Sequence, residues 1–210
     1  MCGFSTPPSR RQLLLAGAAL PLLVHVGWTS PAAALDGVDV LPRSTWGANL
    51  PPTGPLSEEL GGDVRFLLVH HTLTPNTDAE GDVVRRLRGI YGYHTGTKGW
   101  PDIAYNFLVD RFGRVWEGRA GSLNGPVKGD ATGGSQGFAL LCCFIGDHTT
   151  AAPSAAAQAA MGRLLGALAA RYGIDVSPDA TTTFVSRGSN RYPAGATVTA
   201  QTISGHRDMS

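Results

Sequence analysis

The chain has 210 residues, of which 42% are hydrophobic and 16% charged, and its formal net charge is +1. This balance is typical of a single folded domain with a buried core and excludes a chain that is disordered throughout. The near-neutral charge also excludes a strongly basic surface, so we expect no nucleic-acid partner. Nothing in the sequence defines the oligomeric state.

Residues 1–34 have the pattern of an export signal. Arg10 and Arg11 precede an apolar run of 16 residues that ends at Trp28, and a run of alanines follows as a cleavage site. The paired arginines before QLLL resemble a twin-arginine signal. We expect residues 1–34 to be removed and the mature protein to be secreted without a stable membrane anchor. The alternative is a retained anchor, for which a proline-broken run of 16 residues is short.

The next elements lead to a buried strand and a helix. Residues 35–62 are rich in proline and glycine and predict an extended N-terminal arm, which Trp46 attaches to the core. The apolar run at 64–69 predicts a buried strand. Residues 78–93 have apolar side chains at helical spacing and predict a helix capped by Asp78.

The second half alternates strands and helices in the same way. Residues 104–119 predict a hairpin that turns at the DRFG sequence, and the glycine-rich stretch 121–136 predicts a loop. A buried strand at 137–146 and an amphipathic helix at 154–172, capped by Ser154, follow. After a loop at 188–195, residues 197–204 predict a short strand. The pattern indicates a single α/β (α+β) domain over 63–210, with a central mixed sheet flanked by helices.

Two histidines directly follow predicted strands. His70 follows FLLV and His206 follows TISG. A strand end fixes a side chain well, and a neutral imidazole is a good zinc ligand, although a single histidine in such a place is more often structural. His71 competes with His70, but neighbours in a strand face opposite ways, so only one of the two can enter a given site. We expect His70 and His206 to converge at one end of the sheet.

The remaining histidines and the cysteines give weaker signals. His94 lies near the end of a predicted helix, where it either lines a cleft or caps the helix. His148 is expected in a solvated loop. Cys142 and Cys143 are adjacent and point to opposite faces of a strand, so we expect two buried thiols rather than a disulfide.

The motifs occur in an order that resembles a known family. They are RSTWGA, LLVHHT, GWPDIAYNFLVDRFGRVWEGR, SQGFALLCCFIG and ISGHRD. Together they resemble the peptidoglycan recognition proteins and type-2 N-acetylmuramoyl-L-alanine amidases, which are zinc-dependent. The resemblance covers about residues 40–210, and DIAYNFLVDRFGRVWEGR is its most specific part.

The resemblance implies a set of site residues. His70 and His206 match the family's first two zinc ligands, and Tyr105 matches the tyrosine that assists catalysis. The family's third ligand is a cysteine that would fall at about position 214, so the centre is expected to be incomplete in this sequence. Asp208 is an alternative third ligand, and the two cysteines at 142 and 143 stay open.

The function that the resemblance implies is hydrolysis of the amide between N-acetylmuramic acid and L-alanine in peptidoglycan, with Zn²⁺ as cofactor. Glu117 is a candidate for proton transfer or for a salt bridge to Arg119, and His94 and Arg119 are candidate substrate-binding residues. Ala120 follows Arg119 where relatives that select diaminopimelate-type peptides carry Gly-Trp, so peptide preference stays open. The alternatives are a non-catalytic peptidoglycan-binding module and an unrelated secreted metallohydrolase.

Overall fold

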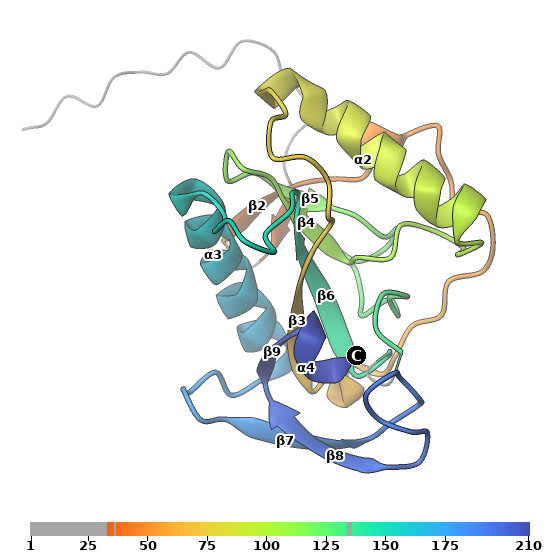
Figure 1. Ribbon diagram of the computed structural model, residues 1–210, viewed down its shortest axis with the longest axis vertical. Helices are drawn as coiled ribbons and strands as arrows, with labels where there is room; N and C mark the ends of the chain where they lie inside the picture. Colours follow the sequence, from red (N-terminus) through yellow and green to blue (C-terminus); the bar gives the residue numbers. More distant parts are fainter. Residues whose placement is uncertain (1–32, 36, 134–135) are drawn as a thin grey trace, which may run out of the picture.

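The computed structural model describes residues 33–35, 37–133 and 136–210. Within them, seven strands form one central sheet in the order β1-β2-β5-β4-β6-β3-β9, and two more form a separate ribbon, β7-β8 (Figure 1). The strands of the central sheet are β1 (Ala33–Leu35), β2 (Val38–Leu41), β3 (Phe66–His71), β4 (Phe107–Val109), β5 (Val115–Glu117), β6 (Ala139–Phe144) and β9 (Ile203–Gly205). The mixture of parallel and antiparallel pairs, with helices around it, is the predicted α/β fold.

The central strands are buried on both faces. Alternate side chains along β3 and β6 belong to two different clusters: Phe66 and Leu68 to one, Leu67 and Leu140 to the other. This follows from the period of two in a strand, and it explains why these strands have continuous apolar sequences. Two hydrophobic cores therefore enclose the sheet, one on each side.

Helices cover both cores. Helix α2 (Val83–Gly92) packs on the first cluster and α3 (Ala155–Tyr172) on the second, and Figure 1 shows them on different sides of the sheet. The predicted cap of α3 is confirmed, because the Ser154 hydroxyl accepts a hydrogen bond from Ala157 N at 3.1 Å. Short helical turns complete the set: α1 (Ser44–Gly47), η1 (Gly61–Asp63), η2 (Glu80–Asp82), the π-turn η3 (Tyr93–Thr97) and α4 (His206–Met209).

The start of α2 differs from the prediction. The α-helix begins at Val83 after the short turn η2, and Asp78 does not cap it. Both Asp78 carboxylate oxygens instead accept hydrogen bonds from Arg86 at 2.7 Å. A bidentate pair with a guanidinium is stronger than a capping bond to a neutral N–H, which explains the change of partner.

The N-terminal segment is tied to the core. The expected role of Trp46 is confirmed: it is buried, and its Nε1–H donates to Glu117 O at 2.8 Å. Within this segment β2 pairs with β5 in parallel, and β1 pairs with β2. The predicted export signal lies outside the described residues, apart from its last two positions, which begin β1. Among the described residues, no helix has the length and hydrophobicity needed to cross a membrane.

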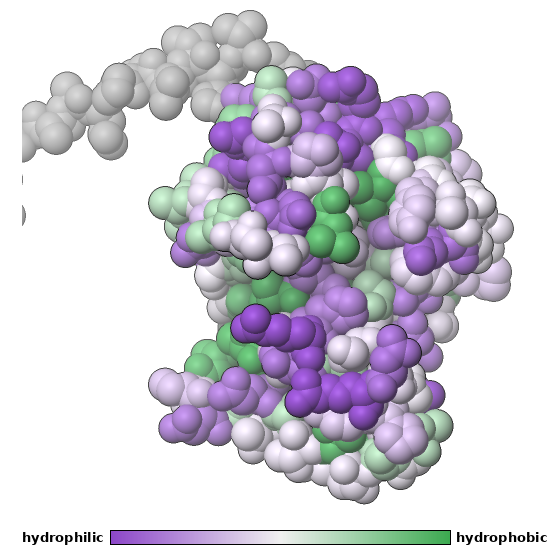
Figure 2. Space-filling model, viewed as in Figure 1, coloured by the Kyte–Doolittle hydropathy of each residue, from purple (hydrophilic) through white to green (hydrophobic). Residues whose placement is uncertain are grey.

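The predicted strand at 197–204 is two strands. Residues Thr197–Gln201 form β8, which pairs with β7 (Thr181–Val185), whereas β9 pairs with β3. The chain changes partner at Thr202, whose hydroxyl donates to Asp175 O at 2.6 Å and whose carbonyl accepts from Leu67 N. On the face seen in Figure 2, hydrophilic residues cover more of the surface than hydrophobic ones, which form smaller patches between them.

Candidate functional site

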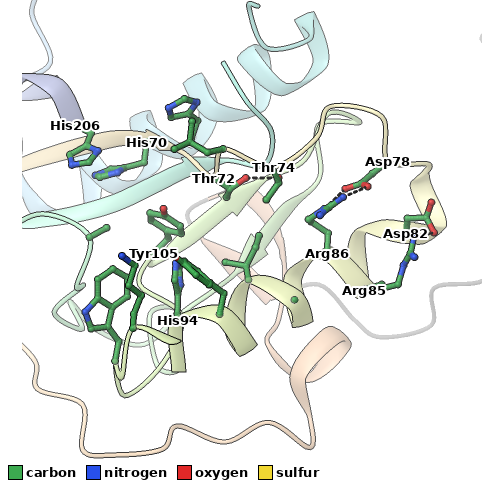
Figure 3. Close-up of a pocket in the computed structure, with 18 residues that line it drawn as sticks. His70, Thr72, Thr74, Asp78, Asp82, Arg85, Arg86, His94, Tyr105 and His206 are labelled. Atoms are coloured by element: carbon green, nitrogen blue, oxygen red, sulfur yellow. Dashed lines mark hydrogen bonds and ion pairs between the residues drawn. The ribbon is translucent and has the colours of Figure 1, made fainter. Parts of the chain in front are cut away.

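A cavity of about 690 Å³ opens where β3 ends. One wall is the His70–Thr74 stretch, which includes the end of β3 and the turn after it, and another is α2 with the turn that leads to Lys98. Tyr105 and His206 complete one end, and Asp78, Asp82, Arg85 and Arg86 lie at the other (Figure 3). The cavity therefore has an end with imidazole and phenol groups and an end with paired charges.

Two parallel strands bring His70 and His206 together. Val69 of β3 pairs with Gly205 of β9, so the next residue of each chain segment, His70 and His206, lies at the same edge of the sheet. His206 directly follows β9 as predicted, whereas His70 lies within β3, one residue before its end, because it still pairs with Cys143 of β6. The two ring centroids are 4.4 Å apart and the planes lie 24° from parallel (Figure 3). This is the predicted convergence of these two residues.

Both imidazoles are held in the neutral form at neutral pH. Burial, followed by the charges of His206 and His71, lowers the pKa of His70 from 6.5 to about 3. Burial and His71 also lower the pKa of His206. The His70 Nε2 forms a hydrogen bond with the Thr132 hydroxyl at 2.9 Å, which fixes the orientation of the ring. A neutral imidazole keeps a lone pair for a ligand or a proton.

Tyr105 borders the same end of the cavity. It is 8% exposed, and its ring centroid is 5.5 Å from that of His70. Burial, with a smaller contribution from the Cys143 thiol, raises the pKa of Tyr105. The phenol is therefore a hydrogen-bond donor across the physiological pH range.

His94 lies beside Tyr105, in the π-turn after α2. Its ring centroid is 5.5 Å from that of Tyr105 and 5.0 Å from that of Trp100. Of the two sequence interpretations, the structure favours the cleft, because His94 Nδ1 accepts from Ala104 N at 3.1 Å instead of capping α2. Burial, then Lys98 and Arg119, lower the pKa of His94 from 6.5 to about 4.

Glu117 and Arg119 are not brought to this cavity. Glu117 lies on β5, separated from β3 by β4 and β6, and its carboxylate accepts hydrogen bonds from Arg43 N and Leu123 N. The Arg119 guanidinium is buried and pairs with Asp130 at 2.6 Å, not with Glu117. Both side chains bind the protein's own backbone or carboxylates, which fits a structural role.

The described residues do not complete a metal site. Among residues 33–35, 37–133 and 136–210, no group of three His, Cys, Asp or Glu side chains is placed to hold an ion. Asp208 accepts from Gly205 N at 2.8 Å and so closes the turn into α4. Cys142 and Cys143 are fully buried free thiols on β6, and burial raises the pKa of both. Two imidazoles are one ligand short of the three that a catalytic zinc takes.

Several cavity residues gave no signal in the sequence. Trp100 follows the π-turn, and Ala131 lies in a glycine-rich loop without periodicity, next to Thr132, which is not in the lining but binds His70. The pairs Asp78–Arg86 and Asp82–Arg85, at 2.7 and 2.8 Å, resemble ordinary surface charges on a helix. The partners lie eight residues apart in the first pair and three apart in the second. Only the three-residue spacing brings two side chains of a helix next to each other, so the first pair could not be predicted from the sequence.

Comparison with known proteins identifies similar chains. A family model described as N-acetylmuramoyl-L-alanine amidase matches residues 60–210. Peptidoglycan recognition protein 1 of Bos indicus is 31% identical over 163 residues, covering 78% of this chain and 80% of that protein. Peptidoglycan-recognition protein LE of Drosophila melanogaster is 34% identical over 112 residues, and an N-acetylmuramoyl-L-alanine amidase of Sus scrofa is 36% identical over 143 residues. The matches cover 32% and 22% of those two longer proteins.

Solved structures share the fold. The crystal structure of Drosophila peptidoglycan recognition protein SD has a TM-score of 0.63 at 20% identity, covering 82% of this chain and 85% of that one. Human PGRP-IβC, in complex with glycosamyl muramyl pentapeptide, has a TM-score of 0.59 at 24% identity, covering 81% and 85%. These similarities agree with the mixed sheet and its flanking helices.

Proposed function

Because the chain belongs to the N-acetylmuramoyl-L-alanine amidase family, we propose that its cavity binds peptidoglycan fragments and that the chain hydrolyses the amide between N-acetylmuramic acid and L-alanine. The observation that carries the proposal is the convergence of His70, His206 and Tyr105 at one end of a 690 Å³ cavity. A cavity of this volume is large enough for a muropeptide segment. The muramyl pentapeptide bound to human PGRP-IβC gives further support.

The protonated phenol of Tyr105 has the chemistry that amide hydrolysis needs. A donor aimed at the carbonyl oxygen stabilises the negative charge that develops there. Because the phenol is buried, its pKa lies above the ordinary value, and it keeps its proton while it donates. The neutral His94 ring, 5.5 Å away, forms the adjoining wall and excludes water from that side.

Zn²⁺ is the cofactor we propose, with His70 and His206 as two of its ligands. A bound zinc polarises a carbonyl and lowers the pKa of its water. The two imidazoles alone do not fit a catalytic zinc, which takes three protein ligands. We therefore assign substrate binding and carbonyl orientation to the described residues and no step to a metal.

A second candidate function is a binding module that holds muropeptides without cleaving them. The specific observation in its favour is that the described residues place no third metal ligand beside His70 and His206. Binding of a muropeptide, unlike its hydrolysis by a zinc enzyme, needs no third ligand. The cavity, the neutral imidazoles and the Tyr105 donor all serve binding as well as hydrolysis. Only an assay of the bond itself separates the two candidates.

The test measures metal, binding and cleavage on the same purified full chain. Zinc per chain, calorimetric binding of muramyl dipeptide, and release of L-alanine-started peptides from cell walls are compared with those of Tyr105→Phe and His206→Ala. For an amidase, Tyr105→Phe lowers the cleavage rate about a hundredfold or more and leaves binding within a few fold. Binding without cleavage in the unsubstituted chain supports the module instead, and absence of both rejects the proposal.

We also propose that the chain is exported through a twin-arginine signal, as Arg10 and Arg11 indicate. Replacing both with lysine is expected to retain the protein in the cytoplasm, because the export receptor reads the arginine pair. Immunoblots of culture medium and cell extract measure the distribution. Equal secretion of the double-lysine variant would reject this route.

A further inference from the structure

Leu73 has an unusual backbone at the wall of the cavity. Among the described residues, it alone has a positive φ without being a glycine, with a value of 57°. Its side chain lines the cavity and is 66% exposed. In this left-handed region the Cβ of an L-residue comes too close to the backbone, so the conformation is unfavourable for leucine. Glycine and asparagine adopt it more easily.

The surrounding turn holds Leu73 in this conformation. The Thr72 hydroxyl forms a hydrogen bond with that of Thr74 at 2.7 Å and accepts from Gly146 N at 2.9 Å (Figure 3). Thr72 N also donates to Phe144 O, so the chain on one side of Leu73 is fixed to the end of β6. These bonds involve the neighbours of Leu73 and require no isobutyl side chain at position 73.

Packing in the core does not account for the leucine either. A side chain with two thirds of its surface exposed contributes little to a hydrophobic core, and a glycine would fit the backbone with less strain. Strained residues that persist at a cavity wall are associated with ligand contact. The side chain is therefore best explained by what the cavity binds.

We propose that Leu73 is a specificity-determining residue that contacts the methyl group of the first amino acid of a peptidoglycan stem, L-alanine. The inference rests on the proposed function. Leu73 follows His70 by three residues, and the Thr72–Thr74 turn lies between the His70–Tyr105 end and the charged end in Figure 3. One carbon separates the L-alanyl methyl from the nitrogen of the amide assigned to the His70–Tyr105 end, and Leu73 is an exposed apolar side chain on the wall that continues from His70.

The cavity has further apolar lining on the wall that faces Leu73. Ile90 and Tyr93 of the opposite wall line the same cavity, whereas the charges of Asp78 and Arg86 are paired with each other. A methyl group buried between apolar side chains gains binding free energy in proportion to the area removed from water. Leu73 therefore selects an alanine over a glycine at the first peptide position.

The experiment compares two ligands that differ by this one methyl. Calorimetry on the full chain measures the dissociation constants of N-acetylmuramyl-L-alanyl-D-isoglutamine and of the analogue with glycine in place of L-alanine. Burial of one methyl predicts that the unsubstituted chain prefers the alanine compound about fourfold. In Leu73→Gly and Leu73→Asn, which both suit the left-handed backbone, the preference falls to about one.

Controls separate the contact from a loss of fold. Leu73→Gly is expected to have an unchanged or higher melting temperature, because it relieves backbone strain. Leu60→Asn alters a leucine that is 77% exposed but lies outside the cavity, and it keeps the fourfold preference. An unchanged preference in both Leu73 variants would overturn the inference and leave the proposed function standing. Absence of binding to either compound by the unsubstituted chain would overturn both.

Discussion

His94 shows how one buried ring couples the cavity to pH. Its pKa is about 4 in the folded chain and 6.5 in the unfolded chain, because burial and the nearby Lys98 and Arg119 disfavour its charged form. At pH values between about 4 and 6.5, the unfolded chain therefore binds more protons than the folded chain. The stability that a neutral His94 contributes is therefore fully present above about pH 6.5 and is lost as the pH falls toward 4.

We predict that His94→Asn reduces this loss. Asparagine offers an oxygen to Ala104 N and does not titrate, so between pH 7 and pH 5 the unsubstituted chain loses about 2 kcal/mol more stability than the variant. Urea unfolding at both pH values measures the difference, and any constant effect of the substitution cancels. Equal losses in the two proteins would show that His94 is not held neutral by its surroundings.

Helix α2 carries one wall of the cavity, and Gly89 lies on that wall. A Cβ built at Gly89 meets no atom within 4 Å, so the position opens to the cavity instead of touching a neighbouring element. Gly92, near the end of the same helix, is also open but does not line the cavity. Substitutions at both glycines change the helix propensity of α2, but only those at Gly89 also fill the cavity.

We predict that Gly89→Ala and Gly92→Ala each stabilise the chain by up to about 1 kcal/mol, since glycine is a poor helix former. Gly89→Trp fills part of the cavity and weakens muramyl dipeptide binding at least tenfold, whereas Gly92→Trp leaves binding unchanged. Calorimetry and urea unfolding measure the two effects. Similar binding by both tryptophan variants would place the ligand elsewhere on the molecule.

The N-terminal segment and the hairpin form one unit through Arg43. Its guanidinium donates to Gly118 O at 2.6 Å and Leu50 O at 2.7 Å, and pairs with the fully buried Asp102 at 2.8 Å. It also lies over the Trp46 ring, 4.8 Å from its centroid. Asp102 additionally accepts from Ala120 N, so the pair connects β2 and α1 to the loop after β5.

We predict that Arg43→Met destabilises the whole fold by about 3–5 kcal/mol, because it leaves the Asp102 carboxylate buried without its cation. Arg85→Met is the matched control: its side chain is 78% exposed, so loss of its pair with Asp82 costs less than about 1 kcal/mol. Urea unfolding of both variants gives the two free energies. A loss at Arg43 as small as that at Arg85 would contradict the inference that the pair with Asp102 holds the segment to the core.

The sequence by itself determined the elements whose signal is local. The strands around 64–69 and 137–146 have continuous apolar sequences because both faces are buried, and the DRFG turn and the Ser154 cap depend on neighbouring residues only. The position of His70 and His206 was also predictable, since adjacent parallel strands end at one edge of a sheet.

The tertiary structure decided what depends on partners distant in the chain. It divided 197–204 into β8 and β9, because Thr202 binds Asp175 and Leu67 instead of continuing the ribbon. In the folded chain Asp78 pairs with Arg86 instead of capping α2, and Glu117 accepts hydrogen bonds from backbone N–H groups outside the cavity. A charged side chain takes whichever partner the fold brings within reach, and spacing along the chain does not carry that information.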